Sequence, residues 1–213
     1  MDERRPSGGG GVELLAQGAD EGLDDRRLAL AEHSGEEEKI LSSFVPLFER
    51  MDNLILLLAP RHTKRTIEVE KLIESSGIQH VRRSSINNGL PAGTRVILLD
   101  TLGELSMLYK AGEAAFVGGT LVDIGGHNLL EPLSAAIPVV FGFSTHQQKA
   151  SAAKLLSSGA GHQIKSSDEL ADFVDQIYHD SSIPEKMKKG ISELQKNSDV
   201  VANANRSLIS EVS

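Results

Sequence analysis

The residues best suited to chemistry lie in one stretch, GGHNLLEP, as Gly125, Gly126, His127, Asn128 and Glu131. An apolar run precedes this stretch and a segment of helical period follows it, which predicts a Gly-rich loop between a strand and a helix. Glycines let a ligand approach the backbone, and the first amides of a helix suit an anion such as phosphate. Glu131 could then accept two hydroxyl hydrogen bonds from a ribose. The pattern predicts a nucleotide site.

A purely structural interpretation stays open for the same residues. Glycine pairs end many strands, Glu131 could serve only the helix dipole, and Asn128 could be only a cap. The sequence has no GxGxxG, no P-loop lysine motif and no GxSxG, so dinucleotide enzymes, P-loop NTPases and α/β-hydrolases are unsupported. It also has no Asp-x-Asp, no cysteine and no pair of histidines at ligand spacing, so we expect no metal and no cofactor.

Three further clusters follow expected strands, where open α/β sheets place their ligands. Arg61, in APRH, could clamp a phosphate, although a surface ion pair is the plain alternative. His33, in EHSGEEE, could donate to an anion, although a lone histidine is more often a solvated neighbour of a cap. In DTLGE, Thr101 is expected to cap the next helix.

Short apolar runs alternate with longer segments of helical period, which predicts an α/β fold: a Rossmann-like parallel sheet with helices on both faces. Ser34 is expected as the N-cap of the first helix, with acids in its first turn. The expected strands are residues 28–31, 54–59, 80–84, 96–99, 114–117, 138–141 and 162–164. The expected helices are that first one and residues 63–76, 103–111, 128–136, 146–157, 167–178, 184–195 and 200–212.

Composition supports one domain. The chain has 213 residues, is 39% apolar and 24% charged, and carries a net charge of -8, which disfavours nucleic acid as a partner. Residues 1–25 are expected to be a disordered tail and residues 26–213 the Rossmann-like domain that carries the predicted nucleotide site. No apolar run is long enough to span a membrane and no secretory signal is evident, so we expect an intracellular protein.

The chain resembles the 3-deoxy-D-manno-octulosonic acid (Kdo) transferases. The similarity covers about residues 28–164 and rests on APRH, on DTLGELSMLYKAGEAAFVGGTLVDIGGHNLLEPLSAAIPVVFG and, more weakly, on EHSGEEE. That family moves Kdo from CMP-Kdo to a lipid A precursor, without a metal, on a GT-B architecture of two Rossmann-like domains. The resemblance implies that this chain corresponds to the C-terminal, donor-binding half.

The resemblance also implies roles for individual residues. It puts Gly125, Gly126, His127 and Asn128 near the CMP phosphate, Glu131 on the ribose, and Arg61 on the charged donor. After Gly142, residues 143–148 read FSTHQQ and depart from the family's usual segment, which puts donor contacts from that loop in doubt.

The family's catalytic base and acceptor surface belong to its N-terminal domain, so no catalytic residue is assigned and we expect no transfer by this chain alone. A non-catalytic nucleotide- or partner-binding module, and another GT-B nucleotide-sugar enzyme, remain alternatives. The family implies mitochondria for a plant protein and the cytoplasmic face of the inner membrane for a bacterial one. Lys186, Lys188 and Lys189 could touch anionic lipid, although a solvated helix surface is the simpler interpretation.

Overall fold

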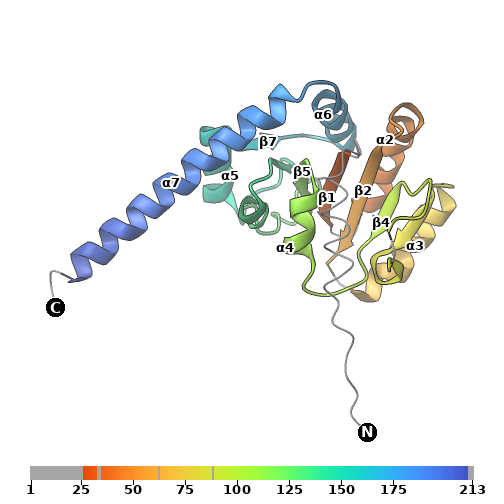
Figure 1. Ribbon diagram of the computed structural model, residues 1–213, viewed down its shortest axis with the longest axis horizontal. Coiled ribbons are helices and arrows are strands. Elements are labelled where there is room, and N and C mark those ends of the chain that lie inside the picture. Colours follow the sequence, from red (N-terminus) through yellow and green to blue (C-terminus); the bar gives the residue numbers. More distant parts are fainter. Residues whose placement is uncertain (1–25, 33–34, 62, 88, 211–213) are drawn as a thin grey trace, which may run out of the picture.

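The chain folds around a seven-stranded parallel sheet, whose order is β3-β4-β2-β1-β5-β6-β7 (Figure 1). The structure is a computed structural model that describes residues 26–32, 35–61, 63–87 and 89–210. The strands are β1 (Arg26–Glu32), β2 (Leu54–Pro60), β3 (His80–Arg82), β4 (Val96–Leu98), β5 (Ala114–Val117), β6 (Val139–Phe141) and β7 (Gly161–Gln163). Each lies within two residues of its expected position, so the predicted fold class is confirmed.

The central strands are buried on both sides because apolar residues fill both of their faces. Strand β2 reads LILLLAP and is buried along its whole length. Leu54, Leu56 and Leu58 pack into one core cluster, whereas Ile55 and Leu57 pack into another on the opposite face. A strand with alternate side chains in two cores must lie between two layers of helices.

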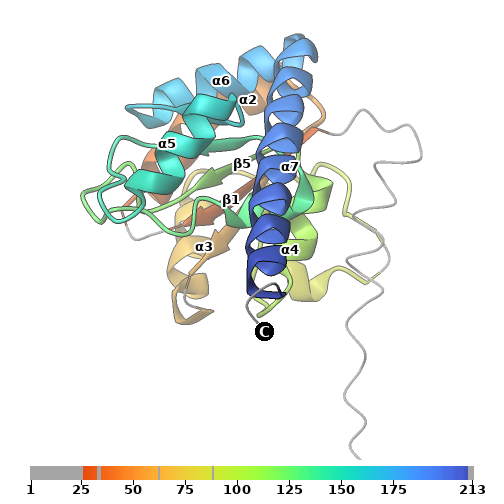
Figure 2. The ribbon, with the colours of Figure 1, turned by 90° about the vertical axis from the view of Figure 1, so that its left-hand side faces the viewer.

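The helices supply those two layers. One core includes α2, α3 and α6, and the other face is covered by α4 and α5. The α-helices are α2 (Glu37–Arg50), α3 (Thr66–Ser75), α4 (Leu105–Leu108), α5 (Lys149–Ser158), α6 (Ser167–His179) and α7 (Ser182–Ser210). The 3-10 helices are η1 (Thr63–Arg65), η2 (Arg83–Ser85), η3 (Tyr109–Ala111) and η4 (Glu131–Ala135). Figure 2 shows α6 and α2 along the top of the molecule, with α7 running down in front of the sheet.

Three expectations about helices were wrong. The segment after Asn128 forms only the five-residue 3-10 helix η4, because the chain turns left-handed at Ala136, with φ 55°. The two helices expected at the C-terminus are one continuous helix, α7, over its described residues. Helix α2 has Glu36 at its N-cap position and no side-chain cap; the proposed cap, Ser34, and the expected tail, residues 1–25, lie outside the described residues.

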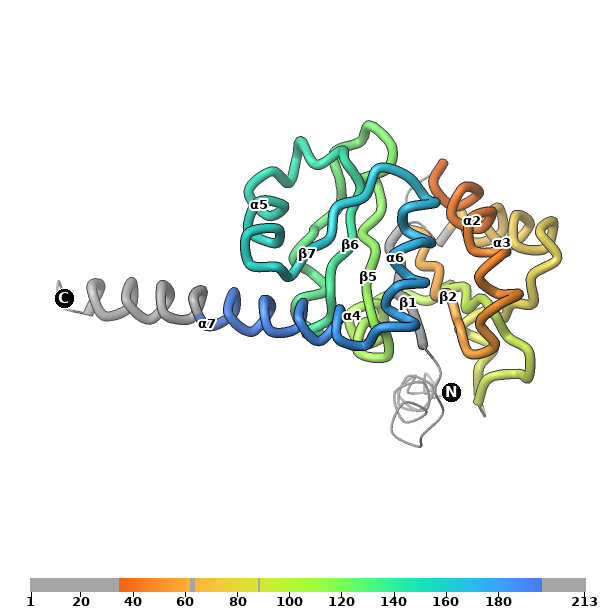
Figure 3. The backbone as a smooth tube through the Cα atoms, turned by 90° about the horizontal axis from the view of Figure 1, so that it is seen from above, coloured from red at the N-terminus to blue at the C-terminus, as the bar shows by residue number. Residues whose placement is uncertain are grey.

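The sheet order places a crevice at the carboxyl ends of its central strands. Strand β1 pairs with β2 on one side and with β5 on the other, so the strand order changes direction between β1 and β5. Figure 3 shows β2 apart from β5 and β6, on opposite sides of this point. Ligands of open α/β sheets bind outside the strand ends at such a point. The loops after β2, β4, β5 and β6 all begin at this edge, and they surround the site.

Candidate functional site

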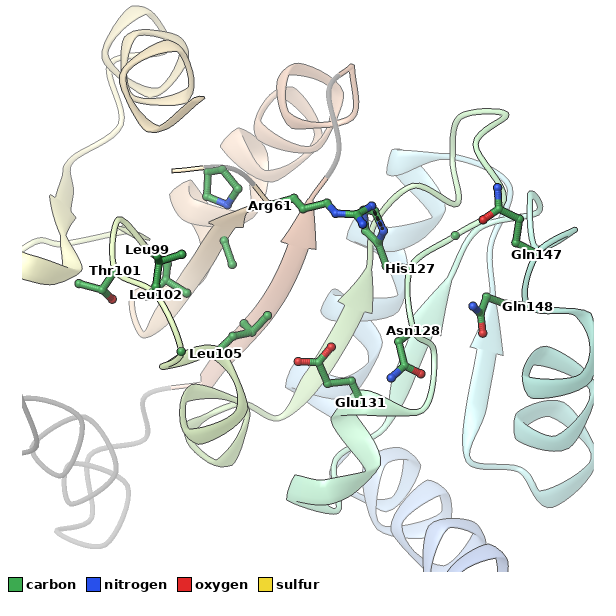
Figure 4. A pocket seen from close by; sticks show the side chains of 14 residues that line it. Arg61, Leu99, Thr101, Leu102, Leu105, His127, Asn128, Glu131, Gln147 and Gln148 are labelled. Carbon is green, nitrogen blue, oxygen red and sulfur yellow. Dashed lines mark hydrogen bonds between the residues drawn. The ribbon is translucent and has the colours of Figure 1, made fainter. Parts of the chain in front are cut away.

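One pocket of about 510 Å³ opens at this edge of the sheet (Figure 4). The end of β2 (Ala59 and Pro60) and Arg61, which follows it, form the back of the pocket. The loop of residues 99–105 after β4 forms one side. The opposite side combines residues 126–131 after β5 with Gln147 and Gln148 after β6. Four loops far apart in sequence therefore meet around one cavity, as a binding site in this fold requires.

Arg61 and His127 form the basic centre of the pocket. The Arg61 Nη1 atom lies 3.1 Å from His127 Nδ1. A guanidinium only donates hydrogen bonds, so Nδ1 is the acceptor and the proton of a neutral His127 ring sits on Nε2. Arg61 comes directly after the buried strand β2, and it is itself exposed. The guanidinium keeps further donors that could bind a ligand's phosphate oxygens.

Asn128 and Glu131 lie on the side of the pocket formed after β5. Asn128 Oδ1 accepts a hydrogen bond from the Leu130 amide at 3.1 Å, which closes a turn just before η4, although η4 itself has Leu130 at its N-cap position and no side-chain cap. Glu131 is exposed and its carboxylate faces the cavity in Figure 4. Burial raises the pKa of the Tyr109 hydroxyl, and the charge of Glu131 raises it further. A carboxylate at this position can accept hydroxyl hydrogen bonds from a ligand.

The amides of Gly126 and His127 are already hydrogen-bonded within the chain. The Gly126 amide donates to the carbonyl of Gly119 at 2.8 Å, and the His127 amide donates to the carbonyl of Gly118 at 3.2 Å. These two amides are therefore not free donors at a helix N-terminus, and the α-helix expected to begin there is absent. The expectation of unbonded main-chain donors at Gly126 and His127 was wrong, although both residues line the pocket.

Gly125 serves packing and does not line the pocket. Its φ is +98°, a conformation that L side chains rarely adopt. A Cβ atom there would lie 2.6 Å from His146 Nε2 and 2.7 Å from Gln147 Cγ. A glycine here lets the loop after β6 pack directly on the loop after β5.

A second Gly-rich turn, at the end of β5, holds a carboxylate of the chain itself. Glu36, which is fully buried, accepts hydrogen bonds from the amides of Gly119 at 2.6 Å, Thr120 at 3.0 Å and Leu121 at 2.7 Å. Successive amides of this kind form an anion-binding nest. From the sequence, Glu36 was expected only to be an acid in the first helical turn, because a contact across more than eighty residues has no local signal.

The structure thus brings together five of the six predicted site residues: Arg61, Gly126, His127, Asn128 and Glu131. The DTLGE segment was identified from the sequence as a cluster after a strand, but only a capping role was expected within it, and Gln147 and Gln148 were not assigned to the site. A place in a loop that follows a strand was the available signal for these two glutamines. His33 lies outside the described residues. Within the described ranges, no group of three or more His, Asp or Glu side chains is arranged to hold a metal ion.

Thr101 does not cap helix α4. The N-cap position is Glu104, which makes no side-chain cap hydrogen bond. The Thr101 hydroxyl instead donates to the Glu104 carboxylate, inside the 99–105 loop. That expectation was wrong, and the contact belongs to the pocket wall.

Comparisons with curated proteins find several glycosyltransferases. The chain is 34% identical over 174 residues to a bifunctional glycosyltransferase/methyltransferase of Fusobacterium nucleatum, which covers 80% of this chain and 27% of that protein. It is 46% identical over 119 residues to the 3-deoxy-D-manno-octulosonic acid transferase of Haemophilus influenzae, which covers 55% of this chain and 27% of that protein. The chain spans about a quarter of the length of these two relatives.

A comparison with solved structures finds a domain of matching size. The fold is similar to the C-terminal CMP-Kdo binding domain of WaaA from Acinetobacter baumannii, with a TM-score of 0.78 and 25% identity. The match covers 87% of this chain and 97% of that domain. No family model matches the chain.

Proposed function

We propose, from the premise that this chain belongs to the Kdo transferase family as its C-terminal domain, that its pocket binds the CMP part of CMP-Kdo. The family relation is shown by the curated transferases and by the matching domain structure. The observation that carries the proposal is the meeting of Arg61, His127 and Glu131 around one cavity. A cation beside an exposed carboxylate suits a ligand that joins an anionic phosphate to neutral hydroxyls.

The pocket offers a separate surface to each part of such a nucleotide. Arg61 would bind the phosphate through charge-assisted hydrogen bonds, and Glu131 would accept the ribose hydroxyls. On the other side of the cavity, Leu99, Leu102 and Leu105 form an apolar wall suited to a flat pyrimidine ring (Figure 4). Phosphate, ribose and base would then lie along one cavity in the order in which CMP joins them.

We propose further that sugar transfer to a lipid A precursor requires more than this chain. The chain spans 27% of the Haemophilus transferase and 37% of the Aquifex aeolicus transferase. Orienting donor and acceptor together supplies much of the rate of such a reaction, and the described residues suggest a donor pocket alone. We therefore expect nucleotide binding without transfer, and we assign no catalytic base.

The other hypotheses are not favoured by the comparisons. A non-catalytic partner-binding module would not need the pocket, and another GT-B enzyme would prefer a different nucleotide. Independence from metal, mitochondrial or inner-membrane location and peripheral contact with lipid stay predictions from the family. Across the part of the chain that the structure describes, no helix is both long and apolar enough to traverse a bilayer.

Calorimetric titration with CMP and with UDP tests the proposal. We expect the chain to bind CMP at least tenfold more tightly than UDP. Arg61→Ala should weaken CMP binding about tenfold or more, because a hydrogen bond to a charged group contributes about 1.5 to 3 kcal/mol. Arg50→Ala is the matched control, since Arg50 is exposed and pairs with Asp175 on α6. No heat of binding with CMP, or equal affinity for UDP, would contradict the proposal.

A further inference from the structure

Two side-chain links join the 99–105 loop, which walls the pocket, to the segment that follows β3. In the first, the Asp100 carboxylate accepts hydrogen bonds from the amide of Ser84, at 2.9 Å, and from the Ser84 hydroxyl. In the second, Arg83 Nη2 donates to Glu104 Oε1 at 3.0 Å. Arg82 pairs with Leu98 in the sheet, so both segments leave adjacent strands side by side.

The second link is a nearly buried ion pair. The side chain of Arg83 is 6% exposed and that of Glu104 is 18% exposed. The other oxygen of the Glu104 carboxylate accepts from Thr101, so this one group closes the loop on itself and ties it to Arg83. A buried guanidinium is costly without its partner, so the pair fixes one position for the loop.

We infer that Arg83 is a positioning residue for nucleotide binding, acting through Glu104 on the 99–105 loop. The inference rests on the proposed function, in which this loop contacts the nucleotide. Arg83 itself is not among the residues that line the pocket, whereas Thr101, Leu102 and Gly103, all between the two anchors Asp100 and Glu104, are. The ion pair therefore shapes the wall without touching the ligand.

The physical consequence is a higher affinity through preorganisation. A loop that is held in its binding shape loses little entropy when the ligand arrives. If the loop without its ion pair held that shape about a tenth of the time, the apparent Kd would rise about tenfold. The loss would appear in binding even where the fold is intact.

Glu104→Gln is the direct test, and Glu70→Gln is its matched control. Glu70 is also 18% exposed and pairs with an arginine, Arg82, one residue before Arg83, but it lies on α3 away from the pocket. We expect Glu104→Gln to raise the Kd for CMP about five- to twentyfold and Glu70→Gln to change it less than twofold. Hydrogen exchange of the amides of residues 100–104 should accelerate only in Glu104→Gln and slow again when CMP binds.

Arginine variants separate positioning from general stability. Arg83→Met should weaken CMP binding as Glu104→Gln does, and Arg83→Lys should restore part of the affinity by donating to Glu104. Equal CMP affinity in Glu104→Gln and wild type, or unchanged exchange of residues 100–104, would overturn the inference. Failure of the wild-type chain to bind CMP would instead contradict the proposed function, and it is visible before any variant is made.

Discussion

The connection that follows β5 contains two Gly-rich segments, and they differ in how they are placed to meet an anion. The turn of residues 118–121 surrounds the buried carboxylate of Glu36 with three amides. Residues 126–131 instead contribute to an open pocket, in which Arg61 contacts His127, while the Gly126 and His127 amides are bonded to the first turn. The first loop is an anion nest already filled by the chain, and the second is a wall that faces solvent.

The difference teaches that glycine pairs mark close backbone packing more reliably than they mark a ligand. Both loops carry a glycine pair, at Gly118 and Gly119 and at Gly125 and Gly126. In the first pair the packing brings amides onto Glu36, and in the second it brings the strand-end loops into contact. What distinguishes the pocket is that two exposed charged side chains, those of Arg61 and Glu131, line it.

The largest effect is expected at the filled nest. Glu36→Ala should lower the free energy of unfolding by about 3 to 5 kcal/mol, because it leaves three amides without their acceptor and each such loss costs about 1 to 3 kcal/mol. Urea unfolding measures the change, and Glu36→Gln, which keeps one acceptor oxygen, should cost less. The exposed Glu38 is the control, since Glu38→Ala should stay within about 0.5 kcal/mol of wild type. A loss below 1 kcal/mol in Glu36→Ala would mean that the nest does not hold the fold together.

The pocket loop should show the opposite pattern. Glu131→Ala should weaken CMP binding by about 1 to 3 kcal/mol, because it removes the carboxylate that we propose accepts charged hydrogen bonds from the ribose. Its unfolding free energy should change by less than about 0.5 kcal/mol, since the side chain is exposed. Calorimetry and urea unfolding of the same preparation give both numbers. Unchanged affinity would remove Glu131 from the site.

Gly126 joins the two loops, so its substitution should affect both properties. A Cβ atom there would lie 2.9 Å from Thr120 Cγ2, and the residue has φ +85°. Gly126→Ala should cost about 1 to 2 kcal/mol of stability, the usual range for an L residue forced into the left-handed region. CMP affinity should fall as well, because the residue lines the pocket. An unfolding free energy and a CMP affinity equal to those of the wild type would contradict this prediction, because they would show that the turn accommodates the added Cβ atom.

An ion pair remote from both loops should give the smallest effect. The hydrogen bond from Arg82 lowers the pKa of Glu70 from its usual 4.5, and His80 adds to the shift. A carboxyl with a lowered pKa in the folded state stabilises the fold above its unfolded pKa, and this contribution is lost as pH falls below about 4.5. Glu70→Gln should therefore be less stable than wild type at pH 7, by under about 1 kcal/mol, and the difference should become smaller at pH 3. A difference that persists unchanged at pH 3 would contradict this assignment.

Much of the fold could be predicted because buried strands are recorded locally in the sequence. The run LILLLAP and the segment of residues 114–117 are apolar without interruption, and both are buried strands. The helix α2 was predictable from its repeat of Ile40, Phe44 and Phe48, all of which are in the core. The continuity of α7 was not, because the polar residues 197–199 resemble a break, yet the backbone stays helical there.

The site was predictable where a residue's type and its place in a loop that follows a strand agreed. Five residues satisfied both conditions and line the pocket: Arg61, Gly126, His127, Asn128 and Glu131. The contact of Arg61 with His127 and the three bonds of Glu36 depend on tertiary packing, so no local pattern could have indicated them. The same holds for Arg83, whose partner Glu104 follows it by 21 residues.

A crystal structure of the chain with bound CMP tests the central claim most directly. The account predicts the phosphate within hydrogen-bond distance of Arg61, the ribose hydroxyls on Glu131 and the base against the 99–105 loop, while Glu36 keeps its three amides. CMP bound outside this pocket, or bound in the nest with Glu36 displaced, would contradict the account.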